Sequence, residues 1–339
     1  MAARTPRFGL IYDFRNPPQW RKPWVEFYDE ILDEIVYAEE LGYDHIWITE
    51  HHFIDDGYTP SVLPIAAAIA RLTKRVRIGT WVLLLPLHNA IRVAEDAATV
   101  DILSNGRLDL GVGLGYKIEE FEAFGVNRRH RASIMDESLE IITRTMAGES
   151  VTLDGRHYQV KDVQITPPPI QQPFPLWVGA RSEAAARRAA RFKANLMIVA
   201  DRPVYEAWAN ALREQGDDPS EFEVLLSAGG YVSADPEALW EELKPHQRYL
   251  RDTYGKWYSD TSDLGEQDPL GQFLNDTDED LRARFVAGTP DDVAAAIERT
   301  LDWIPADHII TSPVPPGASR ELARRSIELF AQEVMPRFR

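Results

Sequence analysis

The chain has 339 residues, 37 basic and 54 acidic side chains, a formal net charge of −17 and no cysteine. This excess of negative charge disfavours binding to nucleic-acid phosphates or to anionic membranes. The lack of cysteine excludes disulfides, thiol nucleophiles and cysteine-ligated zinc or iron–sulfur sites. With 44% hydrophobic and 27% charged residues, the composition is that of a globular protein. The longest apolar stretch, around 81–87, is far too short to span a membrane, and no signal-type segment follows the first residues, so we expect a cytoplasmic protein.

Apolar stretches of strand composition alternate with segments of helical periodicity, which predicts βαβ units around a parallel sheet. Eight strands, each leading into a helix, predict one (β/α)8 TIM barrel over residues 1–339, with its active site at the carboxyl ends of the strands. The competing arrangement is a doubly wound sheet in two halves, but no linker separates two halves. The expected strands are 8–12, 44–49, 77–83, 108–112, 176–178, 196–199, 223–232 and 308–311. The expected helices are 25–41, 61–72, 91–103, 132–146, 183–191, 204–215, 236 to about 254, 290–303 and 320–334.

Two segments interrupt this alternation and are expected as insertions in the barrel. Residues 150–175, after the fourth strand, read as a hairpin centred on Asp154-Gly155 followed by a proline-rich excursion across the surface. Residues 236–280, between the seventh and eighth strands, read as a long polar helix followed by an irregular stretch from 259 to 280. Because such a long irregular stretch is unusual inside a compact domain, we expect a lid there.

The end of the second strand carries an unusual density of titratable groups, Glu50-His51-His52-Phe53. Side chains alternate across a strand, so His51 and His52 cannot both face the barrel mouth if the strand continues. An imidazole there could act as acid or base at neutral pH, or the pair could simply bond to neighbouring carbonyls. Glu50 beside two histidines is only a weak metal signal, because metal-binding barrels draw ligands from several strands, and we expect no metal site.

Two other strand exits suggest a ligand. In residues 111–115 every second residue is glycine. This Gly-x-Gly-x-Gly pattern is not the dinucleotide-binding fingerprint, and no helix start is expected after it. The glycines either let a ligand approach the backbone or make room for a bulky neighbouring side chain. Gly179-Ala180-Arg181-Ser182 directly precedes a helix. Free amides at that helix start, with Arg181 alongside, could bind a phosphate, although a plain Ser182 cap explains the same pattern.

These motifs, taken in order, resemble the bacterial luciferase-like flavin monooxygenase superfamily over nearly the whole chain, which includes FMN- and F420-dependent oxidoreductases. None of the landmarks is specific alone, but together and at these separations they are. They are 38–44, 47–53, 77–80, 104–107, 111–115 with Phe121 and 124–125, 177–182, 288–290 and 334–336.

The resemblance implies a barrel with FMN in its carboxyl-end mouth. His51 matches the histidine that family members place near the reactive edge of the flavin, and His52 matches its neighbour, so both are candidate catalytic residues. The remaining matches concern the flavin itself. Trp81-Val82 matches a non-proline cis peptide under the isoalloxazine, and Gly179-Ala180-Arg181-Ser182 matches the phosphate-binding turn. Gly113-Leu114 replaces a cysteine–arginine pair of luciferase. Because that arginine is missing, Arg181 is left to supply the positive charge for the phosphate.

The resemblance also implies an activity: reduced FMN and O2 oxidise a small or medium apolar organic substrate in a site kept from water. Phe14, Trp20, Phe53, Trp81 and Leu83 are expected to line the substrate pocket, although aromatic residues there could equally be barrel core or an oligomer contact. Residues 255–258 resemble luciferase just before its mobile loop, which favours the lid.

The absence of a nicotinamide fingerprint implies a separate flavin reductase, and we expect a homo-oligomer, a dimer or tetramer. Within the superfamily, an F420-dependent enzyme that transfers hydride without activating oxygen is the alternative, and a non-catalytic luciferase-like subunit is the second. The Glu-His-His-Phe context favours FMN.

Overall fold

The structure, a computed structural model, describes residues 5–261 and 274–339. Within these residues, parallel strands close into a barrel, because β3 pairs with β5 at one end of the strand order and every other neighbour pairs in turn. The predicted (β/α)8 fold is confirmed. Around the barrel the strands are β1 (Arg7–Tyr12), β2 (His45–Ile48), β3 (Arg77–Thr80), β5 (Leu108–Gly113), β8 (Leu176–Gly179), β9 (Asn195–Ile198), β10 (Val224–Ser227) and β13 (His308–Thr311).

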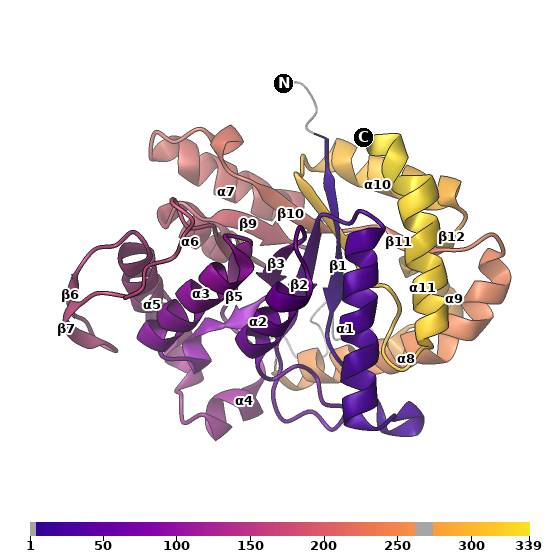
Figure 1. Cartoon of the computed structure of the whole chain (residues 1–339), viewed down its shortest axis with the longest axis horizontal. Helices are drawn as coiled ribbons and strands as arrows, with labels where there is room; N and C mark the ends of the chain where they lie inside the picture. The colour runs from indigo at the N-terminus through magenta and orange to yellow at the C-terminus, as the bar shows by residue number, and fades with distance from the viewer. Residues whose placement is uncertain (1–4, 262–273) are drawn as a thin grey trace.

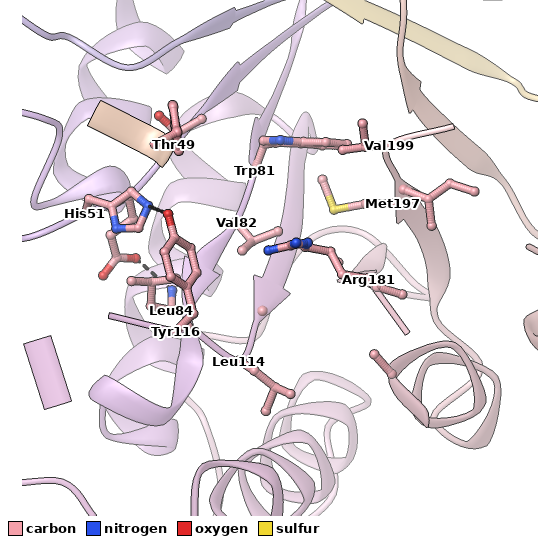
Figure 2. Close-up of a pocket in the computed structure, with 18 of the residues that line it drawn as sticks. Thr49, His51, Trp81, Val82, Leu84, Leu114, Tyr116, Arg181, Met197 and Val199 are labelled. Carbon is pink, nitrogen blue, oxygen red and sulfur yellow. Dashed lines mark hydrogen bonds between the residues drawn. The ribbon is translucent and has the colours of Figure 1, made fainter. Parts of the chain in front are cut away.

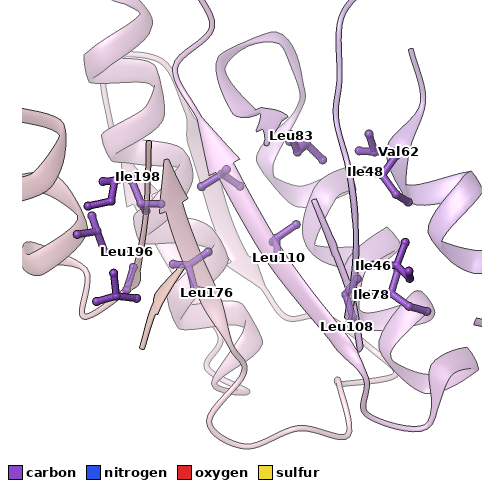
Figure 3. Packing of buried hydrophobic residues seen from close by; sticks show 14 of the residues in the cluster. Ile46, Ile48, Val62, Ile78, Leu83, Leu108, Leu110, Leu176, Leu196 and Ile198 are labelled. Carbon is purple, nitrogen blue, oxygen red and sulfur yellow. The ribbon is translucent and has the colours of Figure 1, made fainter. Parts of the chain in front are cut away.

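Helices surround the strands (Figure 1) and pack on them through a shared apolar layer. Strand residues such as Ile46, Leu110 and Ile198 point outward into this layer (Figure 3). Because alternate strand residues point the other way, a second cluster around Trp47, Trp177 and Met197 fills the interior. The outer helices are α1 (Trp24–Glu40), α2 (Val62–Leu72), α3 (Ala90–Ser104), α5 (Arg131–Met146), α6 (Glu183–Arg191), α7 (Arg202–Glu214), α10 (Pro290–Trp303) and α11 (Arg320–Leu329).

The first insertion lies after β5, as expected. The expected segment 150–175 follows α5, whereas a short helix that was not predicted from the sequence, α4 (Ile118–Ala123), precedes α5 and begins three residues after the last of the alternating glycines. The expectation of no helix start there was wrong. The hairpin pairs β6 (Val151–Asp154) with β7 (Gln159–Val163), and the Gly155 amide donates to the Tyr158 carbonyl across the turn.

The second insertion lies between β10 and β13. It contains β11 (Gly230–Val232), α8 (Pro236–Thr261), α9 (Asp278–Arg284) and β12 (Val286–Gly288), and β11 pairs in parallel with β12 outside the barrel. The expected irregular stretch is helical at both ends, because α8 continues to Thr261 and α9 begins at Asp278. Residues 262–273 of the expected lid lie outside the described part of the chain.

Two strands predicted as continuous are broken. The chain expected as one strand from 223 to 232 leaves the barrel after Ser227, because Gly229 adopts a positive φ of 104° that only glycine takes readily. The strand expected from 77 to 83 ends at Thr80 and resumes as β4 (Leu83–Leu84). A cis peptide between Trp81 and Val82 separates the two pieces.

None of the helices formed by residues 5–261 and 274–339 is long and apolar enough to cross a membrane.

Candidate active site

A cavity of about 450 Å³ lies at the carboxyl ends of the barrel strands. This volume is within the range of small-molecule and cofactor pockets. Residues at or just after the strand ends form its wall, while Tyr254 and Tyr258 of α8 cover it. The strand-end residues are Ile11, Thr49, Trp81, Val82, Gly113, Gly179 and Met197.

His51 faces this cavity and stands in a chain of hydrogen bonds. Its Nε2 lies 3.1 Å from the hydroxyl of Tyr116 (Figure 2). Its Nδ1 lies 2.8 Å from Oε1 of Glu120. The same Glu120 oxygen accepts the backbone amide of His52 at 2.9 Å. In the tautomer that donates Nδ1–H to Glu120, Nε2 accepts from the tyrosine hydroxyl. Burial, reinforced by Tyr258 and Tyr254, raises the pKa of Tyr116 well above its ordinary value, which keeps the phenol protonated.

His52 points to the other side of the chain and does not line the cavity. Its Nε2 bonds to Oε1 of Glu50 at 2.7 Å, as does Nε2 of His88 at 2.7 Å. The second Glu50 oxygen accepts the Leu84 amide of β4 at 2.9 Å. Burial would raise the pKa of Glu50, but the hydrogen bonds from His52, His88 and Leu84 outweigh it and lower the pKa to about 2. The ionised Glu50 therefore fixes β4 beside the cavity.

The floor of the cavity depends on two glycines. A Cβ at Gly113 would lie 2.4 Å from the Val82 side chain, and one at Gly179 would lie 2.9 Å from it. Since real Cβ contacts are never this close, only glycine at both positions allows Val82 to reach the floor. The cis peptide expected between Trp81 and Val82 is present.

The side of the cavity away from His51 is basic (Figure 2). Arg181 and Ser182 lie there at the start of α6, where the Ser182 hydroxyl accepts the Ala185 amide at 3.3 Å. Arg131, the first residue of α5, also lines the cavity and was not foreseen. Helix starts and arginines together favour an anion.

Aromatic residues of α8 form the roof. The Tyr258 ring stacks on Tyr116 with 4.7 Å between ring centres, and the Arg181 guanidinium lies 4.4 Å from the Tyr258 ring centre. Trp257 packs 5.0 Å from the His51 ring. The region expected to hold a lid thus contributes a helix that touches both the histidine and the basic side.

The sequence pattern of the luciferase-like monooxygenases matches residues 7–307. The chain belongs to this family. The oxygenase component of the flavin-dependent trigonelline monooxygenase of Acinetobacter baylyi is 26% identical over 92% of this chain and 90% of its own. An F420-dependent glucose-6-phosphate dehydrogenase of Microbacterium testaceum is 29% identical over 92% and 94%. The oxygenating constituent of 3,6-diketocamphane monooxygenase of Pseudomonas putida, solved with FMN, shares the fold with a TM-score of 0.80 at 18% identity, covering 99% of each chain.

In this luciferase-like chain, four residues expected to line the substrate pocket lie elsewhere. Phe14 packs against Tyr28 in the core, and Leu83 turns into the apolar layer under the helices (Figure 3) while Leu84 faces the cavity. The other two residues lie on the outside of the cavity wall. Trp20 packs against His246 of α8, and Phe53, with a φ of 58°, is 68% exposed beside Phe124.

The residues that replace them are tyrosines. Tyr58, Tyr116, Tyr254 and Tyr258 line the cavity, and the hydroxyls of Tyr58 and Tyr254 are 2.9 Å apart. Glu120 is also a residue that sequence reasoning missed. The available signal was the position of Glu120 in the sequence, shortly after the alternating glycines at the end of a barrel strand.

Proposed function

We propose that this protein is a flavin-dependent monooxygenase that uses reduced FMN and O2 to oxidise a small or medium apolar organic molecule. The observation that supports this most is the polarity of one cavity, in which His51 and Tyr116, joined to Glu120, lie on one side and Arg181 lies on the other, with Arg131 also in the wall. The oxygenase component among the relatives and the FMN-bound structural neighbour point the same way.

The residues present fit FMN. Arg181, Ser182 and the start of α6 would hold the phosphate, with Arg131 supplying the positive charge that Leu114 lacks. Val82, between Gly113 and Gly179, would support the ring system. When bound and reduced, FMN supplies the electrons for oxygen activation.

The protein's own residues handle protons and water. His51 can hold or move a proton at Nε2, and Glu120 keeps the ring oriented through Nδ1. Tyr116 extends this chain to a hydroxyl in the cavity. The buried apolar wall and the roof formed by α8 exclude water from the reacting groups.

The protein further needs a source of reduced flavin. The Gly-x-Gly-x-Gly segment is not a nicotinamide fingerprint, and the trigonelline relative is named as an oxygenase component. We therefore propose a separate flavin reductase as a partner, and a homo-oligomer as the working form.

A second candidate is an F420-dependent oxidoreductase that transfers hydride without activating oxygen. The 29% identity to an F420-dependent dehydrogenase over almost the whole chain favours it. The same basic side and histidine would serve that cofactor.

Titration of the purified protein with FMN, riboflavin and F420 separates these candidates. We expect FMN to bind at least about tenfold more tightly than riboflavin, because charge-assisted phosphate contacts contribute about 1.5–3 kcal/mol. Arg181→Ala should remove most of this difference, whereas Arg187→Ala, which removes an exposed arginine of the same helix that pairs with Glu214, should not.

Binding of F420 without FMN would replace the proposal by the hydride-transfer function. Failure to bind either cofactor would indicate a non-catalytic subunit.

A further inference from the structure

A second group of ligating side chains lies at the cavity wall, which Glu50 lines and the two histidines of the group do not. Glu50 and His52 follow β2, and His88 lies between β4 and α3. One ligand atom from each residue falls within 4.8 Å of the others. Both imidazole Nε2 atoms converge on the same carboxylate oxygen, Glu50 Oε1, at 2.7 Å each. From sequence alone Glu50 and His52 lacked a ligand from another strand, and His88 provides it.

We propose that Glu50, His52 and His88 form a binding site for a divalent transition-metal cation of the zinc class. Two imidazole nitrogens and one carboxylate oxygen suit zinc and its neighbours, whereas magnesium and calcium prefer oxygen ligands alone. No established property of the cavity assigns this role, because neither imidazole lines it.

The spacing of the ligand atoms is close to what a cation needs. Zinc bonds of ~2.0–2.1 Å in tetrahedral geometry place neighbouring ligand atoms about 3.3 Å apart. Each imidazole would therefore withdraw from Glu50 Oε1 by about half an ångström, and the two nitrogens, which lie within 4.8 Å of each other, would settle about 3.3 Å apart. The proton of each imidazole would reside on Nδ1. Three protein ligands leave one coordination position for water.

The surroundings hold the ligands in place and leave a route of entry from outside. The Leu84 amide fixes the other Glu50 oxygen at 2.9 Å, so the carboxylate cannot swing away. The Phe124 ring packs 4.8 Å from His52. His88 is the accessible ligand, with 29% of its side chain exposed, so a cation can arrive from outside without passing through the cavity.

Occupation would join the end of β2 to the start of α3 beside the cavity. A ligand that binds only the folded state stabilises it. The site does not use His51, Arg131 or Arg181, so it stands whether or not the flavin proposal is correct.

Calorimetric titration of chelator-treated, full-length protein with zinc chloride tests the site. We expect about one zinc ion per chain at this site, a thermal midpoint raised by several degrees, and at least a tenfold loss of affinity in His88→Gln. His157→Gln is the matched control. His157 and His130 form another histidine pair, with 5.5 Å between their ring centres. This pair could bind zinc adventitiously.

Absence of saturable zinc binding, or binding that His157→Gln abolishes and His88→Gln leaves unchanged, would overturn the site. If His88→Gln does not fold, cobalt substitution of the wild type decides. Visible absorption of four-coordinate cobalt supports the site, and an unchanged hexaaquo spectrum overturns it.

Discussion

His51 and His52 are neighbours in sequence, yet they belong to different hydrogen-bonding systems. His51 lines the cavity and bonds to Glu120 and Tyr116, whereas His52 does not line it and bonds to Glu50. The alternation of side chains would allow only one of them to face the barrel mouth if the strand continued, but β2 ends at Ile48 and both histidines lie in the loop after it. The alternation did not predict the partner of His51, because Glu120 lies 69 residues further along the chain on a helix that its sequence did not announce.

Replacing Glu120 by glutamine should slow turnover without removing the ring of His51 from the site. The amide keeps the shape but loses the negative charge that favours a protonated imidazole, so we expect kcat to fall by about 10- to 100-fold. As Glu120 acts through His51, the pH–rate profile should shift as well. Steady-state kinetics across pH measures both effects.

Glu119→Gln serves as the control for this change. Glu119 is the exposed neighbour on α4, and its carboxylate lies 3.7 Å from the Lys117 ammonium. Glu120→Asp, which retains the charge, should recover part of the lost activity. Equal rates and identical pH profiles for Glu120→Gln and wild type would remove Glu120 from the mechanism.

At the scale of elements, sequence periodicity located the barrel helices well, because each repeats apolar residues on one face. It failed where single residues end a strand. The glycine pair Gly229-Gly230 was the visible signal that β10 ends early, and pairing of β11 with β12 depends on residues more than 50 positions apart. The carboxyl end of α8 could not be predicted from the sequence either, because the residues near that end contact the cavity wall, which is formed by distant segments of the chain.

Strands β1, β10 and β13 are joined at the amino-terminal end of the barrel by a charged group that sequence did not predict. Glu223, just before β10, pairs with Arg7 and accepts a hydrogen bond from His308 Nε2 at 3.2 Å. Burial would raise the pKa of Glu223, but His308 and then Arg7 outweigh it and lower the pKa to about 2 from an ordinary 4.5.

A lowered pKa in the folded state means that this carboxylate stabilises the fold above about pH 4.5 and that its contribution is lost as the pH falls toward 2. Glu223→Gln should therefore be less stable than wild type at pH 7, and the difference should shrink below pH 4.5. Because the side chain is 34% exposed, we expect about 1 kcal/mol. Urea unfolding followed by tryptophan fluorescence measures it, with the exposed Glu221→Gln as control. A difference that stays constant from pH 7 to pH 3 would contradict this assignment.

For the whole molecule, composition indicated a globular protein and the landmarks indicated the family, but neither predicted which residues line the cavity. Aromatic residues chosen by sequence position, such as Phe14 and Phe53, lie in the core or outside the wall, while tyrosines of α8 close the cavity from a distant segment. The net charge of −17 likewise concealed a local basic side at Arg131 and Arg181. The lining of the cavity and its local charge depend on the direction of each side chain and on contacts between residues far apart in the sequence, and composition contains neither.

Rapid mixing of the protein, loaded with reduced FMN, with oxygenated buffer tests the central claim most directly. The account predicts that O2 reoxidises the bound flavin, and that His51→Ala changes the rate of reoxidation by at least about tenfold, the scale of a positioned acid or base. His157→Ala, which removes an imidazole that does not line the cavity, should match the wild type. Reduced FMN that O2 leaves unoxidised in the complex, or equal reoxidation rates in wild type and His51→Ala, would contradict it.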